Sequence, residues 1–167
     1  MLWSSSRPNG FTLAELSVIL AVMGILSAIA IPSFLSWYQS KQLNDALSRL
    51  ENALREAQQQ AITRSQTCTV NIPTGTDRTI SGNCLITGDR PLKHVQIWHS
   101  RTLNNNQPWR IQFDFKGRTE GFDQNGTIFL AIPETTTATR CLVISNGIGL
   151  MRTGNYDLQK QSCTTPQ

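Results

Sequence analysis

Residues 16–31 read LSVILAVMGILSAIAI, an uncharged run in which Ser17 and Ser27 are the polar residues. With its flanks at 11–14 and 33–35, the run reaches roughly the twenty residues that a membrane-crossing helix needs. Glu15 is the single charge inside this longer stretch. The length and apolar character predict a helix over 11–35 that lies in a membrane or in the core of an assembly.

The composition of the whole chain hides this run. The chain has 167 residues, of which 39% are hydrophobic and 16% charged. These averages exclude collagen, coiled-coil and fully disordered classes. Fifteen Lys and Arg against eleven Asp and Glu give a formal net charge of +4. That excess favours acidic surfaces but is small for a dedicated nucleic-acid binder.

The residues before the run predict how it is processed and oriented. In a secretory signal peptide the cleavage site follows the apolar core, whereas here the junction Pro8-Asn9-Gly10 precedes it. The apolar run is therefore expected to remain in the mature protein, with residues 1–10 as a leader. The leader carries Arg7 and no acidic residue, which places this end in the cytoplasm and the remainder outside the inner membrane.

Past residue 35 the apolar residues become periodic. They recur at helical spacing, which predicts one continuous helix over about 11–63. Its amphipathic second half belongs to the segment 36–66, which is expected to pack on the rest of the chain. Pro32 lacks an N–H and is expected to kink or locally melt the helix, with Gly24 as a second weak point. The stripe consists of Leu43, Ala46, Leu47, Leu50, Leu54, Ala57 and Ala61.

The remaining residues, 67–167, are typical of a β-rich head. Short alternating or β-branched runs stand between turn signals, and those at 126–132 and 141–145 are the most apolar, so they are expected in the centre of a sheet. Further strands are predicted at 68–72, 94–99 and 109–115, the last with Trp109, Ile111, Phe113 and Phe115 on one face. The fold class is α+β, with a long kinked N-terminal helix packed on an antiparallel sheet.

Four cysteines, Cys68, Cys84, Cys141 and Cys163, lie outside the membrane by this orientation, where disulfides persist. Three pairings are possible. Cys68–Cys84 and Cys141–Cys163 are favoured because they close short loops, each stabilising the chain by about 3 kcal/mol.

The segment Gly10-Phe11-Thr12-Leu13-Ala14-Glu15-Leu16 resembles the cleavage and methylation motif of type IV pilins and type II secretion pseudopilins. The resemblance implies that a membrane prepilin peptidase cuts after Gly10 and methylates Phe11. It also implies that Glu15 meets the N-terminal amine of a neighbouring subunit during filament assembly. Two alternatives stay open: an ordinary single-pass anchor, and a Glu15 that only reaches the lipid headgroups.

The head also resembles the GspH/FimT group of minor pilins and pseudopilins. The resemblance lies in Phe113-x-x-x-Gly117, the runs at 126–130 and 141–145, and Arg152. Some members of this group carry a Gly-Arg-x-Arg element implicated in DNA binding. The corresponding stretch here, 149–152, has a single arginine. Arg118, Arg140 and Arg152 are the candidate DNA contacts, and they require clustering on one face.

An enzymatic function is not expected. The chain has no Gly-x-Ser-x-Gly elbow, no phosphate-cradling glycine loop and no metal-ligand spacing, and no cofactor is predicted. His94 and His99 are expected on opposite faces of one strand, which does not suit a shared metal ion. The sequence thus predicts a minor pilin or pseudopilin that supports filament assembly, with other pilins, the prepilin peptidase and the inner membrane as partners. A pilus-tip subunit that binds DNA for uptake is the alternative.

Overall fold

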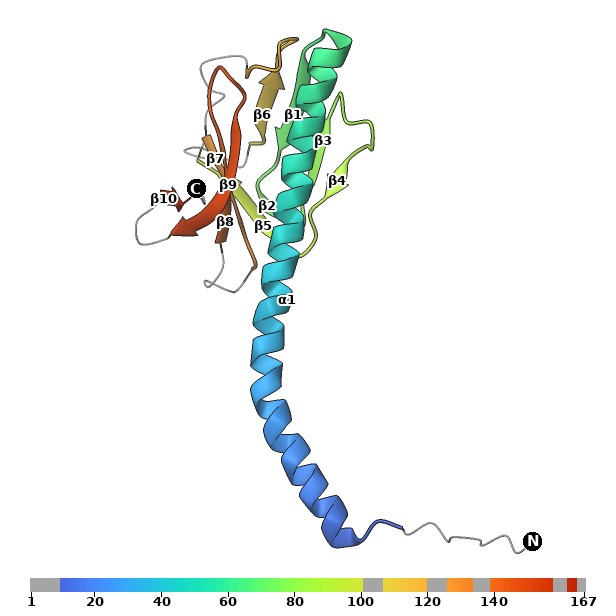
Figure 1. The fold of residues 1–167 in the computed structure, drawn as a ribbon. Helices are drawn as coiled ribbons and strands as arrows, with labels where there is room; N and C mark the ends of the chain where they lie inside the picture. Colours follow the sequence, from blue (N-terminus) through green and yellow to red (C-terminus); the bar gives the residue numbers. More distant parts are fainter. Residues whose placement is uncertain (1–9, 101–106, 120–125, 134–138, 158–161, 165–167) are drawn as a thin grey trace, which may run out of the picture. The chain divides into compact units, whose positions relative to one another are not determined.

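The described residues form one long helix and two antiparallel sheets (Figure 1). The structure is a computed structural model that describes residues 10–100, 107–119, 126–133, 139–157 and 162–164. It divides into two compact units, a stem unit up to Tyr38 and a head unit from Gln39 onward. The predicted leader, apart from Gly10, lies outside the described residues.

The helix α1 (Leu13–Arg64) agrees with the predicted helix over about 11–63. It continues through Gly24 and Pro32 without interruption, so the expected local melting does not occur. The blue part of α1 in Figure 1 curves smoothly instead. A helix can absorb a proline by bending, because only the hydrogen bond of the missing N–H is lost.

The head unit contains a four-stranded and a six-stranded sheet among its described residues, and all strand pairs are antiparallel. The first has the order β4-β3-β1-β6 and the second the order β10-β9-β8-β7-β5-β2. The four-stranded sheet consists of β1 (Cys68–Ile72), β3 (Thr79–Gly82), β4 (Arg90–Pro91) and β6 (Trp109–Phe113). The six-stranded sheet consists of β2 (Gly75–Thr76), β5 (Gln96–His99), β7 (Gly126–Ala131), β8 (Thr139–Ile144), β9 (Met151–Asp157) and β10 (Ser162–Thr164).

The core of the head unit lies where α1 meets both sheets. All seven residues of the predicted helical stripe are buried, together with Ala53. They belong to one hydrophobic cluster with residues such as Ile72 and Ile111 of the first sheet and Ile128 and Leu142 of the second. The two most apolar strands, β7 and β8, occupy the centre of the six-stranded sheet as predicted.

Two strand predictions were too long by two residues each. The strand expected at 94–99 begins at Gln96, because His94 lies before it with a φ of 60°, which an extended strand does not allow. The strand expected at 109–115 ends at Phe113, so Phe115 does not join the buried face of Trp109 and Ile111. Phe115 instead stands in the following turn and is 54% exposed.

Candidate functional site

The start of α1 is closed by a hydrogen-bonded cap between Thr12 and Glu15. The Glu15 N–H donates to Thr12 Oγ1 at 3.2 Å, and the Thr12 N–H donates to Glu15 Oε2 at 3.4 Å. This reciprocal pair is a capping box, in which the two residues satisfy backbone donors that the first turn of a helix leaves open. The spacing Thr-x-x-Glu is the sequence signal for it. The cap holds the Glu15 carboxylate at the positive end of the helix dipole.

Gly10 and Phe11, the predicted cleavage residues, directly precede this cap. Both are exposed, Phe11 by 78%, and a Cβ atom added at Gly10 would meet no atom within 4 Å. The peptide bond between them is therefore uncovered, just before the capping residue Thr12.

The rest of the stem unit exposes an apolar surface all around the helix. Every residue from 10 to 38 is exposed, and its large apolar side chains range from 41% exposed at Ile19 to 86% at Leu13. By length and composition, α1 can cross a membrane. A helix that is apolar on all sides requires lipid or other apolar helices around it.

A partly buried charge cluster fastens the segment after β3 to α1. Glu56 Oε1 accepts hydrogen bonds from the Ile86 N–H at 2.7 Å and the Thr87 N–H at 3.2 Å, and Glu56 Oε2 pairs with Arg90 Nη2. The side chains of Arg90 and Glu56 are 19% and 15% exposed. Sequence reasoning missed this cluster because its members lie about thirty residues apart.

A second contact joins α1 to turns of both sheets. Gln58 Nε2 donates to the carbonyl oxygens of Gly117 at 2.6 Å and Gly149 at 3.2 Å. Both glycines have positive φ angles, and a Cβ atom at Gly149 would lie 2.5 Å from the Gly117 oxygen. The close approach of these two turns therefore requires glycine at 149.

The four cysteines form disulfides Cys68–Cys84 and Cys141–Cys163, the pairing that the short loops favour. The first joins the strand that follows α1 to the residues after β3. The second joins β8 to β10, the edge strand of its sheet.

The three candidate DNA-contacting arginines do not share one face. Arg118 pairs with Asp114, whose Oδ2 lies 2.7 Å from Arg118 Nη2. Arg140 donates to Asn44 Oδ1 at 2.8 Å, on the side of β8 that faces α1. Arg152 is opposite Val143 in the β8–β9 register, and Val143 is three residues from Arg140, so Arg152 and Arg140 point to opposite faces.

The pKa of the Asp114 carboxyl reflects its pairing. Burial raises the pKa of Asp114. Hydrogen bonds from the backbone and side chain of Arg118 and from the Lys116 N–H lower it by more, so the pKa lies below its ordinary value. Asp114 therefore stays ionised and keeps Arg118 occupied in the turn that follows β6.

The two histidines have separate surroundings, and only His99 lies in a strand. Its ring is buried 5.7 Å from the Trp109 ring, between centroids. Burial lowers the pKa of His99, and a hydrogen bond with the Gln107 backbone partly offsets that effect. His94 is exposed, and its N–H donates to Asp77 Oδ1 at 2.5 Å.

Among the residues that the structure describes, no three His, Cys, Asp or Glu side chains gather where they could hold a metal ion.

Two family models match the chain. The model described as type II transport protein GspH matches residues 46–147, which are 102 of the 167 residues. The model of the prokaryotic N-terminal methylation motif matches residues 5–31. Because the first match covers more than half of the chain, the chain belongs to the GspH family.

Individual pilins are similar over shorter segments. The chain is 44% identical over 52 residues to the type IV major pilin protein PilA of Myxococcus xanthus, and 43% identical over 54 residues to a fimbrial protein of Pseudomonas aeruginosa. These segments cover 31% and 32% of this chain, and 23% and 34% of the two relatives. The chain thus aligns with about a quarter to a third of the length of these relatives.

The fold itself has a solved counterpart. The crystal structure of the type IV minor pilin FimU of Pseudomonas aeruginosa matches with a TM-score of 0.51 and 15% identity, over 78% of this chain and 97% of that chain. The family match, the methylation motif and this fold make the protein a GspH/FimT-like subunit of the type IV pilin and pseudopilin class. These are families of structural subunits.

Proposed function

We propose that the chain is a minor pilin or pseudopilin that supports the assembly of a type IV pilus or a type II secretion pseudopilus. A prepilin peptidase cuts between Gly10 and Phe11 and methylates Phe11. Before assembly, α1 holds the subunit in the inner membrane as a single pass with the head unit outside. On assembly, the same helix surface packs against the stems of other pilins.

The observation that carries this proposal is the exposed apolar surface of residues 10–38. Burying one large apolar side chain stabilises a protein by about 1.5–3 kcal/mol. Within residues 10–38, the described part of the stem unit, every large apolar side chain is exposed. Lipid and a bundle of similar stems are the two surroundings that supply this burial, and a filament subunit passes from the first to the second.

Glu15 supports the assembly step. A carboxylate in the apolar part of a membrane costs about 3 kcal/mol or more, so it is retained where a partner offsets that cost. Cleavage after Gly10 creates a new positive charge, the amine of Phe11. The capping box holds the Glu15 carboxylate at the same end of the helix, where the Phe11 amine of an adjoining stem can reach it.

The test compares Glu15→Ala with Ser17→Ala, a control change two residues away. The Ser17 hydroxyl donates to the Ala14 carbonyl oxygen of its own helix. Both variants are expected to be cleaved and methylated, as mass spectrometry of the N-terminus shows. Only Glu15→Ala is expected to be missing from sheared filaments. Normal incorporation of Glu15→Ala would contradict the role of Glu15.

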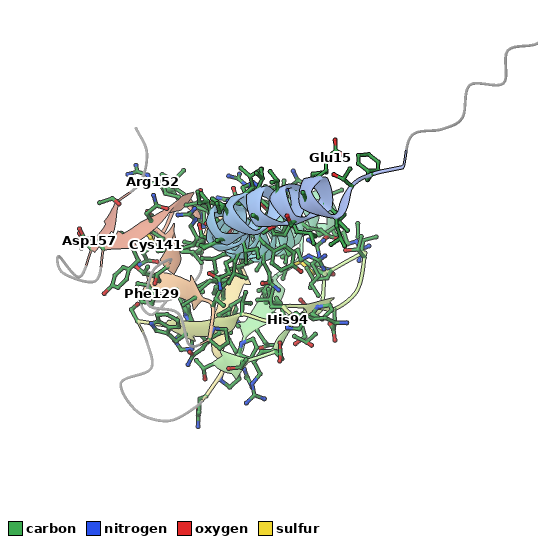
Figure 2. The ribbon with its side chains drawn as sticks, turned by 90° about the horizontal axis from the view of Figure 1, so that it is seen from below. Glu15, His94, Phe129, Cys141, Arg152 and Asp157 are labelled. Carbon is green, nitrogen blue, oxygen red and sulfur yellow. A yellow bond between two sulfur atoms is a disulfide. The ribbon has the colours of Figure 1, made fainter. Side chains whose placement is uncertain are left out.

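The alternative function, DNA binding at a pilus tip, has less support. It needs a shared basic face, yet Arg118 is engaged by Asp114, and Arg140 and Arg152 point to opposite faces. Figure 2 shows Arg152 near the start of β9 and Asp157 at the end of the same strand. A gel shift at low salt with double-stranded DNA separates the two functions, because phosphate contacts weaken steeply as salt rises.

Pilus and pseudopilus are separated by the phenotype of a deletion. Loss of protein secretion alone indicates a pseudopilus, and loss of twitching indicates a pilus. Loss of DNA uptake while pili remain indicates the DNA-binding alternative.

A further inference from the structure

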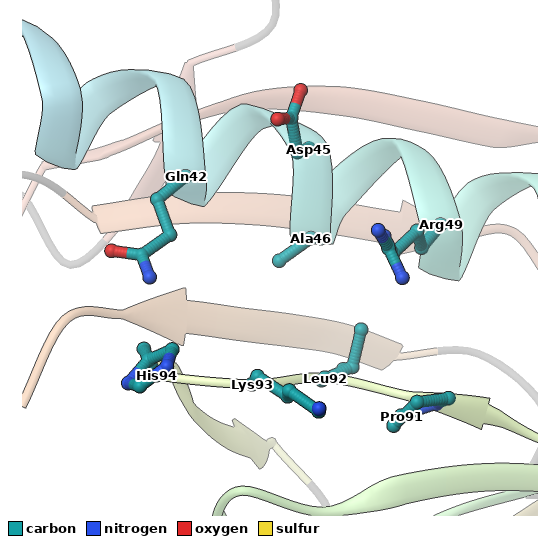
Figure 3. Close-up of a pocket in the computed structure, with 8 residues that line it drawn as sticks. All are labelled: Gln42, Asp45, Ala46, Arg49, Pro91, Leu92, Lys93 and His94. Carbon is teal, nitrogen blue, oxygen red and sulfur yellow. The ribbon is translucent and has the colours of Figure 1, made fainter.

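A groove of about 350 Å³ lies in the head unit between α1 and the residues that lead from β4 to β5. Figure 3 shows Gln42, Ala46 and Arg49 pointing from α1 toward the segment 91–94. Their spacing places them on one face of the helix. Ala46 and Leu92 are buried and give the groove an apolar floor.

The rim of this groove carries unbalanced positive charge. Arg49 and Lys93 are exposed, and among the described ion pairs neither has a carboxylate partner. Asp45 also lines the groove, but Figure 3 shows its carboxylate turned away from the segment 91–94, and it pairs with Lys41 at 3.7 Å. His94 adds an exposed imidazole at one end.

The wall formed by the segment 91–94 is fixed by hydrogen bonds on both sides. The Leu92 N–H donates to the Arg78 carbonyl oxygen at 2.8 Å. Arg90, just before this segment, pairs with Glu56 and donates to the Arg49 carbonyl oxygen at 3.4 Å. A ligand therefore meets a groove that is already formed, and its binding does not require ordering of the wall.

We propose that this groove binds an extended segment of a neighbouring pilin-class subunit through an Asp or Glu side chain. The carboxylate would lie between Arg49 and Lys93, and a small apolar side chain beside it would rest on Ala46 and Leu92. This inference rests on the proposed function, because it names a contact of the subunit within a filament.

A polypeptide fits the groove better than a membrane surface does. Anionic membranes are bound by broad clusters of four or more basic residues. Here two permanent cations border a recess with an apolar floor, and the lining residue Asp45 is paired with Lys41. A recess of this kind accepts side chains, which a lipid headgroup layer does not present.

Photo-crosslinking in cells that assemble the filament tests the proposal. The uncharged lining residue Gln42 is replaced by p-benzoylphenylalanine in the full chain, and crosslinked peptides from assembled filaments are identified by mass spectrometry. The expected product joins the p-benzoylphenylalanine at position 42 to a pilin-class segment with Asp or Glu within two residues of the attachment point.

Charge reversal makes the test specific. The double variant Arg49→Glu with Lys93→Glu is expected to lower the crosslink yield about tenfold, as the loss and reversal of two exposed charge contacts implies. Reversing the acidic residue of the mapped partner segment to Lys is expected to restore it. Arg110→Glu is the matched control, because Arg110 is also exposed but lies on β6 outside the groove.

Three results would overturn the proposal: a crosslink to lipid, a yield that the double variant leaves unchanged, or no crosslink in filaments that contain the subunit. If the double variant has a lowered melting temperature, Arg49→Gln and Lys93→Gln are scored singly against the same criteria. Absence of the wild-type subunit from every filament would instead refute the proposed function.

Discussion

Replacing Glu56 by alanine is expected to destabilise the head unit strongly, because Glu56 holds Arg90 and two backbone N–H groups against α1. The change removes the acceptor of the Ile86 and Thr87 N–H groups and leaves the Arg90 guanidinium without its carboxylate.

The structure sets the size of the effect. Removing one partner of a buried pair costs about 3–5 kcal/mol, and the residual exposure of 15% and 19% puts this pair near the lower end. We expect a loss of about 3 kcal/mol, or roughly 10 °C in melting temperature for a unit of this size. Glu56→Gln keeps an acceptor for the Ile86 N–H but removes the charge, so an intermediate loss is expected.

The assay is thermal and guanidinium unfolding of the full chain in a mild detergent, followed by circular dichroism. Glu51→Ala is the matched control on the same helix, because Glu51 pairs with Arg55 at the surface, with 26% and 53% of the side chains exposed. That pair is worth about 0.3–0.5 kcal/mol. A loss in Glu56→Ala no larger than in Glu51→Ala would refute the reasoning that this cluster fastens the segment to α1.

Three further changes test other parts of the head unit. Gly149→Ala should lower the free energy of unfolding in guanidinium by roughly 2–5 kcal/mol, because its φ is 64° and its Cβ would lie 2.5 Å from a backbone oxygen. Gly147→Ala is the control, because Gly147 has a φ of 84° but open space around it. Its loss should be only about 1–2 kcal/mol. Because the pKa of His99 is lowered from 6.5, the unfolded chain takes up the proton first, so stability should fall as pH drops through 6.5 toward the folded-state pKa. His99→Gln should flatten that dependence, measured as urea midpoints at several pH values. Replacing Cys141 and Cys163 together by serine should cost about 3 kcal/mol, and an unchanged unfolding midpoint would contradict the stabilising role of their disulfide.

The helix and the central strands could be predicted because their signals are local. A buried stripe repeats every three or four residues along α1, so seven positions could be assigned from spacing alone. The run at 126–132 is apolar on both faces of a strand, which is typical of a central position. β1 was predicted with its correct ends because Pro73 and Gly75 follow it.

The short strands could not be predicted in the same way. β2 and β4 have two residues each, and β4 contains Pro91. Such segments become strands because a longer neighbour offers hydrogen-bonding groups, and proline is tolerated since β4 is an edge strand. That information lies in the partner strand rather than in the segment itself.

The site residues also differ in whether their signals are local in sequence or depend on the folded chain. The cleavage motif, Glu15 and its capping residue Thr12 are close in sequence and can be read directly. Gln58 meets Gly149 across 91 positions, so its role needs the folded chain. The candidate arginines also needed the folded chain, because DNA contact requires a shared face, and the strand register places Arg140 and Arg152 on opposite faces.

The buried stripe of α1 has a mechanical consequence for a filament subunit under tension. Its contacts with the sheets extend from Leu43 to Ala61, about 27 Å along the helix axis. A pull along that axis loads the whole interface in shear, so the stripe residues and the Glu56 and Gln58 contacts must yield together. Peeling them apart one at a time would need far less force. Within the head unit, the sheets therefore hold the α1 segment 43–61 in shear, which resists pulling the helix out along its axis.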